Sequence, residues 1–215
     1  MLYPLNLDLS GKSCVVVGGG RVAQLKVRGL IAAGANVTVI APAITEMLRC
    51  LVEKNQMHWQ AEAYEYGMLE PHAPLLVFCA SDSEKANRES AREAKIIRAL
   101  VNAAAQPELA DFQVPSRVER GDVLLTVATS GGSPAFSRLL RERLEREYPE
   151  SFAEFLPRLK ALREEIKQLP GGSDEHHRCW RNALNQCVID LVRAGQLDQA
   201  EEEIRNGIID AGAEP

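Results

Sequence analysis

The sequence predicts an α/β fold: a doubly wound parallel sheet, followed by a strand-rich segment and a small helical region. Up to residue 113, short β-branched runs alternate with segments whose apolar residues recur at helical spacing. The links between these segments are short, a pattern that favours right-handed crossovers between parallel strands. After residue 113 two strand-like runs follow each other directly, and the rest of the chain has helical character.

Five strands are expected in the first part. They are "SCVVVGG" (13–19), "NVTVIAP" (36–42), "MHWQAEA" (57–63), "PLLVFCAS" (74–81) and "RALVNAA" (98–104). The fourth is fully apolar, which is typical of a strand in the centre of a parallel sheet. Helices are expected between them, the first ending at Gly34, the second at about Asn55, and the third beginning with Asp82 as its N-cap.

The second part is expected to begin with a strand pair that turns at Arg120, Gly121 and Asp122. A helix entered through Ser133 and Pro134 follows, and further helices extend from Ser151 to the end. We therefore expect three parts, residues 1–113, 114–148 and 149–215. Three local features are predicted in the last part: capping boxes formed by the pairs Ser151/Glu154 and Asp198/Glu201, a kink or late helix start at Pro157, and a break at "LPGGSD" (169–174).

Bulk composition excludes several classes of protein. The net charge of −5 over 215 residues argues against a general nucleic-acid binder, which is usually basic. No apolar run is long enough to span a bilayer, and the N-terminus lacks the layout of a signal peptide. The five cysteines are odd in number and widely spread, with Cys14 and Cys79 inside strand-like runs. These features predict a reducing, cytoplasmic compartment.

A glycine motif connects the first strand to the first helix. "VVVGGGRVA" gives Gly18-x-Gly20-x-x-Ala23, and this position after a strand and before a helix is what makes the motif informative. Gly18 permits the tight turn, Gly20 leaves room for a pyrophosphate, and Ala23 lets the helix pack closely on the strand. The alternative is a structural glycine turn. We favour a Rossmann-type dinucleotide site with the phosphates at the helix N-terminus.

One part of that fingerprint is absent. The second strand should end in an acidic residue for the ribose hydroxyls, but here it ends in Ile40, Ala41 and Pro42. No arginine replaces it at that position, so these residues do not distinguish NAD from NADP.

Four segments together resemble the precorrin-2 dehydrogenase family, the N-terminal module of siroheme synthase that also occurs as a free-standing protein. They are "VVVGGGRVAQLKVRGLIAAGANVTVIAP", "FCASDSEKANRE", "VNAAAQPELADFQVPS" and "TVATSGGSPAFSRLLRERLE". The resemblance implies oxidation of precorrin-2 to sirohydrochlorin with NAD as cofactor. It also implies a homodimer in which the strand-rich segment serves dimerisation, and in some members insertion of divalent iron or cobalt into the product.

The resemblance also implies a set of site residues. The dinucleotide contacts fall on Arg21, Val22, Pro42 and Ala43, and Ser81 and Asp82 line the same crevice. The family element "Asn-Val-Val-Asp-x-Pro" falls on residues 102–107, so Asn102 is retained while the family's proposed catalytic aspartate is Ala105. The serine-rich element falls on residues 128–134 and keeps a hydroxyl at Thr129. No resident metal site is expected. The residues expected to contact substrate are Ser116, Arg117, Arg120, Thr129, Ser130 and Arg138.

Ala105 leaves three interpretations open. The chain is an engineered active-site variant, or a natural protein with another base such as Asp111 or Asp122, or a non-catalytic tetrapyrrole carrier. A plain strand end without functional meaning is the fourth, weakened by the position of residue 105 at the carboxyl end of a strand. The arginines also have a structural alternative, because Arg138/Glu142, Arg141/Glu145 and Arg143/Glu147 are i,i+4 pairs typical of a solvated helix face.

Overall fold

The computed structural model describes residues 2–168 and 172–210. The chain divides into two compact units, Met1–Val114 and Pro115–Pro215, and each is described by itself. The predicted division into three parts stays a prediction.

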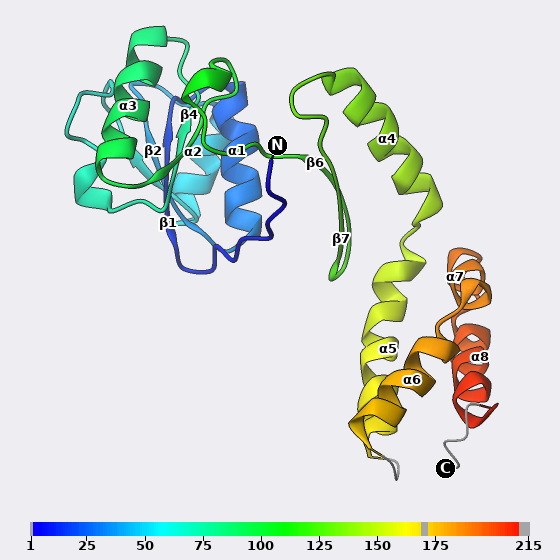
Figure 1. Ribbon diagram of the computed structural model, residues 1–215. Coiled ribbons are helices and arrows are strands. Elements are labelled where there is room, and N and C mark those ends of the chain that lie inside the picture. Colours follow the sequence, from blue (N-terminus) through cyan, green and yellow to red (C-terminus); the bar gives the residue numbers. More distant parts are fainter. Residues whose placement is uncertain (1, 169–171, 211–215) are drawn as a thin grey trace. The chain divides into compact units, whose positions relative to one another are not determined.

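The first unit is built on a five-stranded parallel sheet in the order β3-β2-β1-β4-β5 (Figure 1). The strands are β1 (Ser13–Val17), β2 (Asn36–Ile40), β3 (His58–Gln60), β4 (Leu76–Cys79) and β5 (Leu100–Asn102). The central strand β1 pairs with β2 on one side and β4 on the other, so the strand order reverses beside it. The predicted doubly wound parallel sheet is therefore confirmed.

Helices cover both faces of this sheet (Figure 1). They are α1 (Arg21–Ala32), α2 (Glu46–Glu53) and α3 (Glu84–Ile96), with short 3-10 turns η1 (Glu70–His72) and η2 (Pro107–Leu109). One apolar cluster joins α1 and α2 to the sheet through Val27 and Leu48. The other joins α3 to the opposite face through Ala91 and Ala94. The alternation of side chains along each strand explains why one sheet supplies both clusters.

The helix ends follow local chemistry. Gly34 has φ +76° just after α1, which confirms its predicted place at the helix end. The prediction that Asp82 caps α3 is wrong. Ser83 is the N-cap, and its hydroxyl accepts from the Ala86 N–H at 3.3 Å. Aspartate and serine are equally good caps, so the sequence did not separate the two neighbours.

The outer strands are shorter than predicted, with three residues each. Arg98 has φ +62°, a turn conformation outside the strand region, so β5 begins only at Leu100. It ends at Asn102, and residues 103 and 104 belong to the following turn.

The second unit begins with an antiparallel hairpin, β6 (Ser116–Arg120) and β7 (Val123–Val127), which turns at Gly121 (φ +58°) as predicted. Next comes α4 (Pro134–Glu147), capped by Ser133 with Pro134 as its first residue. The remaining helices share one apolar cluster. They are α5 (Ser151–Lys167), α6 (Ser173–Ala183), α7 (Gln186–Arg193) and α8 (Leu197–Asp210). The predicted break at 169–174 includes residues 169–171, which lie outside the described residues.

Two local predictions for this unit are wrong, and a third is wrong in part. Ser151 does not cap α5: the N-cap position is Glu150, and the buried Ser151 hydroxyl has no hydrogen-bond partner among the described residues. Asp198 lies inside the first turn of α8, and its carboxylate accepts from Arg158 at 2.7 Å. Pro157 does not delay the start of α5, which runs through it, and the kink expected there stays a prediction.

Two further features concern the helices and the cysteines. Over residues 2–168 and 172–210, no helix is long and apolar enough to cross a membrane. Cys14 and Cys79 are buried within the sheet, as predicted. Burial raises the pKa of the Cys14 thiol to about 11, so it stays protonated and packs as a small apolar side chain.

Candidate functional site

The glycine turn after β1 lies where the strand order reverses. Gly18 has φ +123°, and its N–H donates to the Ile40 carbonyl oxygen at 2.9 Å. A Cβ on Gly18 would lie 2.3 Å from the Ala80 oxygen, and one on Gly19 would lie 1.9 Å from the Ala43 oxygen. Gly18 and Gly19 must therefore be glycines, because backbone atoms of the segments after β4 and β2 lie too close to the turn for a Cβ.

Gly20 differs from these two glycines, because the packing of the chain does not require it. A Cβ built on it would meet no atom of the described chain within 4 Å. It is the N-cap of α1, and in the described structure no side chain caps the helix and no acidic residue occupies its first turn. The first N–H groups of a helix have no partner within the helix, so this uncapped N-terminus, with its positive dipole end, fits an incoming phosphate. Ala23 is fully buried, as close helix–sheet packing requires.

The other predicted cofactor residues come together around this turn. The Thr45 N–H donates to the Gly19 oxygen at 3.0 Å, which holds the segment carrying Pro42 and Ala43 against the glycines. The backbone of Ser81 exchanges two hydrogen bonds with the Asn87 side chain, at 3.0 and 2.8 Å. Arg21, Val22 and Asp82 are exposed at the rim.

Asn87 is a functional candidate that sequence reasoning missed. It is 4% exposed, inside the first turns of α3, and it fixes the backbone at the end of β4. Asparagine is a weak helix former. An asparagine inside a helix that directly follows a strand was therefore the feature of the sequence that could have indicated a role for Asn87.

The corner after β5 contains the position where the family's aspartate is expected. Asn102 is buried, and its side-chain amide donates to the Phe112 oxygen at 3.0 Å. The chain then turns, with the Gln106 N–H bonded to the Ala103 oxygen at 3.2 Å. Ala105 is exposed in this turn, so a side chain at residue 105 is accessible to a ligand.

The two carboxylates considered as replacements for that aspartate each have contacts of their own. One Asp111 oxygen accepts from the Val101 N–H at 2.9 Å, and the other lies 3.9 Å from Lys95 Nζ. Asp122 lies in the hairpin turn of the second unit, where the hydrogen bond and charge of Lys160 lower its pKa. Asp111 is thus fixed to the backbone of β5, whereas Asp122 forms an exposed ion pair within the second unit.

The predicted hydroxyl residues of the second unit form a cluster at the start of α4. Thr129 Oγ1 and Ser137 Oγ are 3.0 Å apart, and Thr129 Oγ1 also accepts from the Ser133 N–H at 3.3 Å. Ser130 has φ +50° and is exposed, as are Gly131 and Gly132. The Thr129 hydroxyl therefore organises the loop that leads into the helix.

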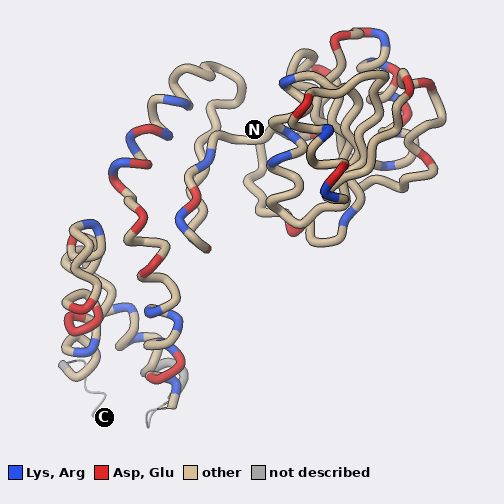
Figure 2. The backbone as a smooth tube through the Cα atoms, turned by 180° about the vertical axis from the view of Figure 1, so that it is seen from behind, with Lys and Arg blue, Asp and Glu red and all other residues tan. Residues whose placement is uncertain are grey.

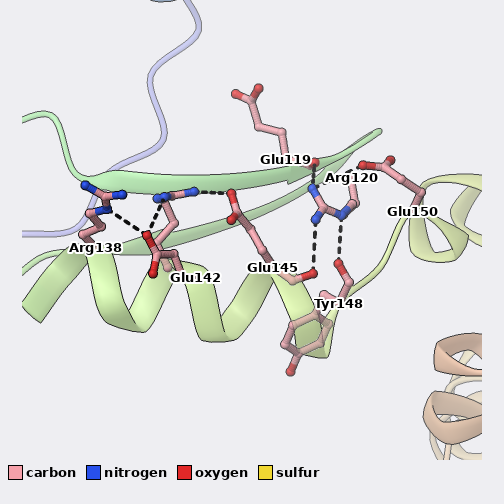
Figure 3. Close-up of polar contacts among 8 residues, drawn as sticks. Glu119, Arg120, Arg138, Glu142, Glu145, Tyr148 and Glu150 are labelled. Carbon is pink, nitrogen blue, oxygen red and sulfur yellow. Dashed lines mark hydrogen bonds and ion pairs between the residues drawn. The ribbon is translucent and has the colours of Figure 1, made fainter.

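The arginines predicted to contact substrate differ in how many contacts already hold their guanidinium groups. Figure 3 shows two of them, Arg120 and Arg138. Arg120 is largely buried, and its guanidinium donates to the carbonyl oxygens of Glu119, Glu145 and Tyr148, which ties the hairpin to the end of α4. A cation at that position also complements the helix dipole. We assign Arg120 this structural role.

Arg117, Arg138 and Ser116 remain accessible. Arg117 pairs with Glu119 at 2.9 Å, and Arg138 pairs with Glu142 at 2.8 Å on the outer face of α4. Acidic and basic residues alternate along this helix (Figure 2), and the expected Arg141/Glu145 pair also forms. Glu147 instead lies 3.7 Å from Arg193. Such exposed pairs contribute little to stability, so these arginines can exchange partners.

Comparison with known proteins decides the family. A family model described as "Putative NAD(P)-binding" matches residues 5–116. The chain belongs to this NAD(P)-binding family. The match covers the first unit, and the predicted NAD cofactor agrees with it.

Relatives extend the similarity beyond that unit. The siroheme synthase of Nitrosococcus oceani is 35% identical over 198 residues, which are 92% of this chain and 42% of the relative. That of Nitrosospira multiformis is 34% identical over 212 residues, 94% of this chain and 44% of the relative. The predicted resemblance to siroheme synthases is thus confirmed, although the chain spans less than half the length of these curated relatives.

The fold also occurs among solved structures. One example is "SirC, precorrin-2 dehydrogenase", with a TM-score of 0.76, 24% identity, and coverage of 96% of this chain and 98% of that one. The predicted fold class, a Rossmann-type sheet followed by a small sheet and a helical region, is therefore confirmed.

The open position of Gly20 gives a sharp prediction for this NAD(P)-binding protein. Gly20→Ala is expected to weaken NAD binding by about 10- to 100-fold, because the added methyl group occupies space that the phosphates need. The thermal midpoint should fall only slightly. Isothermal titration with NAD and a melting curve measure the two effects.

Gly172 provides the matched control. It is also the N-cap of a helix without a side-chain cap, and a Cβ there would likewise meet no described atom within 4 Å. Gly172→Ala should therefore cost similar stability and leave NAD affinity unchanged. Equal NAD affinity in the Gly20 variant and the parent would show that the phosphates lie elsewhere.

Proposed function

We propose that this chain carries out the NAD-dependent oxidation of precorrin-2 to sirohydrochlorin, a step of siroheme biosynthesis. The observation that carries the proposal is the open glycine turn, which shares the carboxyl edge of one parallel sheet with the corner at residues 102–107. Ligands of such sheets bind at this edge. Similarity to siroheme synthases over most of the chain supports the choice of substrate.

In this proposal some residues hold the dinucleotide, and the position for proton transfer lies elsewhere on the same sheet edge. The glycine turn, with Pro42 and Ala43 on one side and Ser81 on the other, would hold the dinucleotide. NAD, when bound, supplies the acceptor for the hydride that leaves the substrate. The oxidation also releases a proton from the ring system, and a base near residue 105 is the natural acceptor.

Ala105 has no group that can accept this proton, Asp111 is bonded to the Val101 N–H, and Asp122 belongs to the second unit, where it pairs with Lys160. The proton must then pass to solvent without a positioned base. We therefore expect the chain to bind NAD and tetrapyrrole but to turn over slowly. A positioned base typically contributes about 10²–10⁴-fold to a rate.

The proposal includes a homodimer formed through the second unit. Leu124 on the hairpin and Phe136 and Leu139 on α4 are 45%, 52% and 56% exposed. Large apolar side chains grouped on neighbouring elements favour a protein partner, and a second copy agrees with the predicted dimerisation segment.

The test is an anaerobic assay in which NADH formation from precorrin-2 is followed by absorbance, together with titration of sirohydrochlorin and NAD onto the protein. Binding of both ligands with slow turnover supports the proposal. Absence of sirohydrochlorin binding would overturn it. Addition of ferrous ion to bound sirohydrochlorin tests the predicted chelatase activity separately.

A further inference from the structure

Lys26 is a half-buried cation in the second turn of α1. Its Nζ lies 5.7 Å from the centroid of the Phe78 ring. Among the described residues, no carboxylate lies within 4.0 Å of this ammonium, whereas Lys85, Lys95, Lys160 and Lys167 each have one. Lys12 and Lys54 also have none, but both are exposed to water. Lys26 is therefore a partly desolvated charge without a counter-ion.

Such a charge is costly for the folded protein. Burial lowers the pKa of Lys26, which means that the charged form is less stable there than in water. A cation over a phenylalanine ring recovers only about 0.5–1 kcal/mol at a partly exposed site. A methionine or leucine at residue 26 would cover Phe78 without this cost. A bound anion from outside the chain would offset the cost of this charge and so explain why residue 26 is a lysine.

The contacts of Phe78 place this ammonium near the corner that carries residue 105. Phe78 in β4 is the register partner of Asn102 in β5. Its ring also packs edge-on against Phe112, with centroids 5.6 Å apart. The carbonyl oxygen of Phe112 accepts from the Asn102 side chain. Lys26, Phe78, Asn102 and Phe112 thus form one connected group on a single face of the sheet.

The cofactor phosphates are not the expected partner. They belong at the N-cap Gly20, and Lys26 lies about 9 Å further along the axis of α1. The neighbouring Leu25 is 66% exposed on the same helix. A cation beside exposed apolar surface suits a flat apolar ring system with carboxylates on its periphery.

We propose that Lys26 binds a peripheral carboxylate of the tetrapyrrole and so positions the macrocycle beside the corner after β5. This inference rests on the proposed function, since it names the contact by which that substrate is held. Lys26 acts here as a substrate-binding residue, and hydride and proton transfer take place elsewhere in the site.

The experiment compares Lys26→Met with Arg28→Met in the full chain. Arg28 is an exposed cation on the same helix, so its variant removes the same charge from the same element. Fluorescence titration measures sirohydrochlorin binding, and calorimetry measures NAD binding. We expect Lys26→Met to weaken sirohydrochlorin about 10- to 100-fold with NAD unchanged, Lys26→Arg to restore part of the loss, and Arg28→Met to change neither.

The outcomes separate this inference from the proposed function. A parent chain that binds NAD but not sirohydrochlorin overturns both. A parent chain that binds sirohydrochlorin, with equal affinity in Lys26→Met, overturns only the role of Lys26. An equal loss of NAD and sirohydrochlorin assigns the cation to the cofactor and also overturns it. Circular dichroism checks folding, and Lys26→Gln replaces the methionine variant if that variant is unfolded.

Discussion

Replacing Ala105 with aspartate is expected to raise the rate of NADH formation from precorrin-2 by about 10²–10⁴-fold. The residue lies in an exposed turn directly after β5, so the new carboxylate has no buried partner to break and is accessible to the substrate. The gain should appear in kcat, because the carboxylate acts on the proton that leaves during oxidation. NAD affinity should stay the same, since the glycine turn is unchanged.

Ala104→Asp is the matched control for this variant. Ala104 is the preceding residue, it is also exposed, and the substitution adds the same charge to the same turn. Only a carboxylate at residue 105 should restore turnover. Equal gains in both variants would indicate a general charge effect. Tight sirohydrochlorin binding with no turnover in either variant would favour a tetrapyrrole carrier over an enzyme.

Replacing Glu93 with alanine is expected to destabilise the first unit by at least about 3 kcal/mol. Glu93 is 2% exposed, and its carboxylate accepts hydrogen bonds from the Tyr64 hydroxyl and from the N–H groups of Gly67, Leu69 and Glu70. Burial first, and then the bond to Glu93, raise the pKa of Tyr64, so its hydroxyl stays protonated and donates. Truncation leaves the buried Tyr64 hydroxyl and Leu69 N–H without an acceptor, and the N–H groups of Gly67 and Glu70 lose theirs nearer the surface.

Urea denaturation measures this loss, with Glu89→Ala as the control. Glu89 is one turn earlier on α3, and its side chain is 42% exposed and 3.8 Å from Lys85. Its removal should change the free energy of unfolding by less than about 0.5 kcal/mol. Tyr64→Phe should give a smaller loss than Glu93→Ala, because it removes one donor and leaves the carboxylate three others. Equal midpoints for Glu93→Ala and the parent would contradict the proposed role.

The strands and helices of the first unit could be predicted because each has a local pattern. The β-branched run at residues 13–17 and the glycines after it define β1 and the turn without tertiary information. The functions of the individual glycines could not be separated this way. Gly19 is required by the Ala43 oxygen 1.9 Å from its missing Cβ, and that neighbour comes from beyond the next strand.

Polar residues whose partners are distant in sequence were also missed. Glu93 looks like an ordinary helix glutamate until the chain brings the segment at residues 64–70 over it. Asp111 was considered as a catalytic base, but it bonds the Val101 N–H ten residues earlier. In both cases the carboxylate satisfies backbone groups, and the sequence alone does not show which backbone groups lack a partner.

The bond of Asp111 to β5 has a further consequence for the solubility of the protein. β5 is an edge strand, and the edge of a sheet is a template on which other chains can add. Here the chain folds back along β5. The Asp111 carboxylate accepts a hydrogen bond from the Val101 N–H, and the N–H groups of Asp111 and Phe112 donate to the Val101 oxygen at 2.9 and 3.4 Å. The N–H and carbonyl groups of Val101, the central residue of β5, are thus both occupied. Neither group is free to bond a strand of another chain, which protects this edge against aggregation.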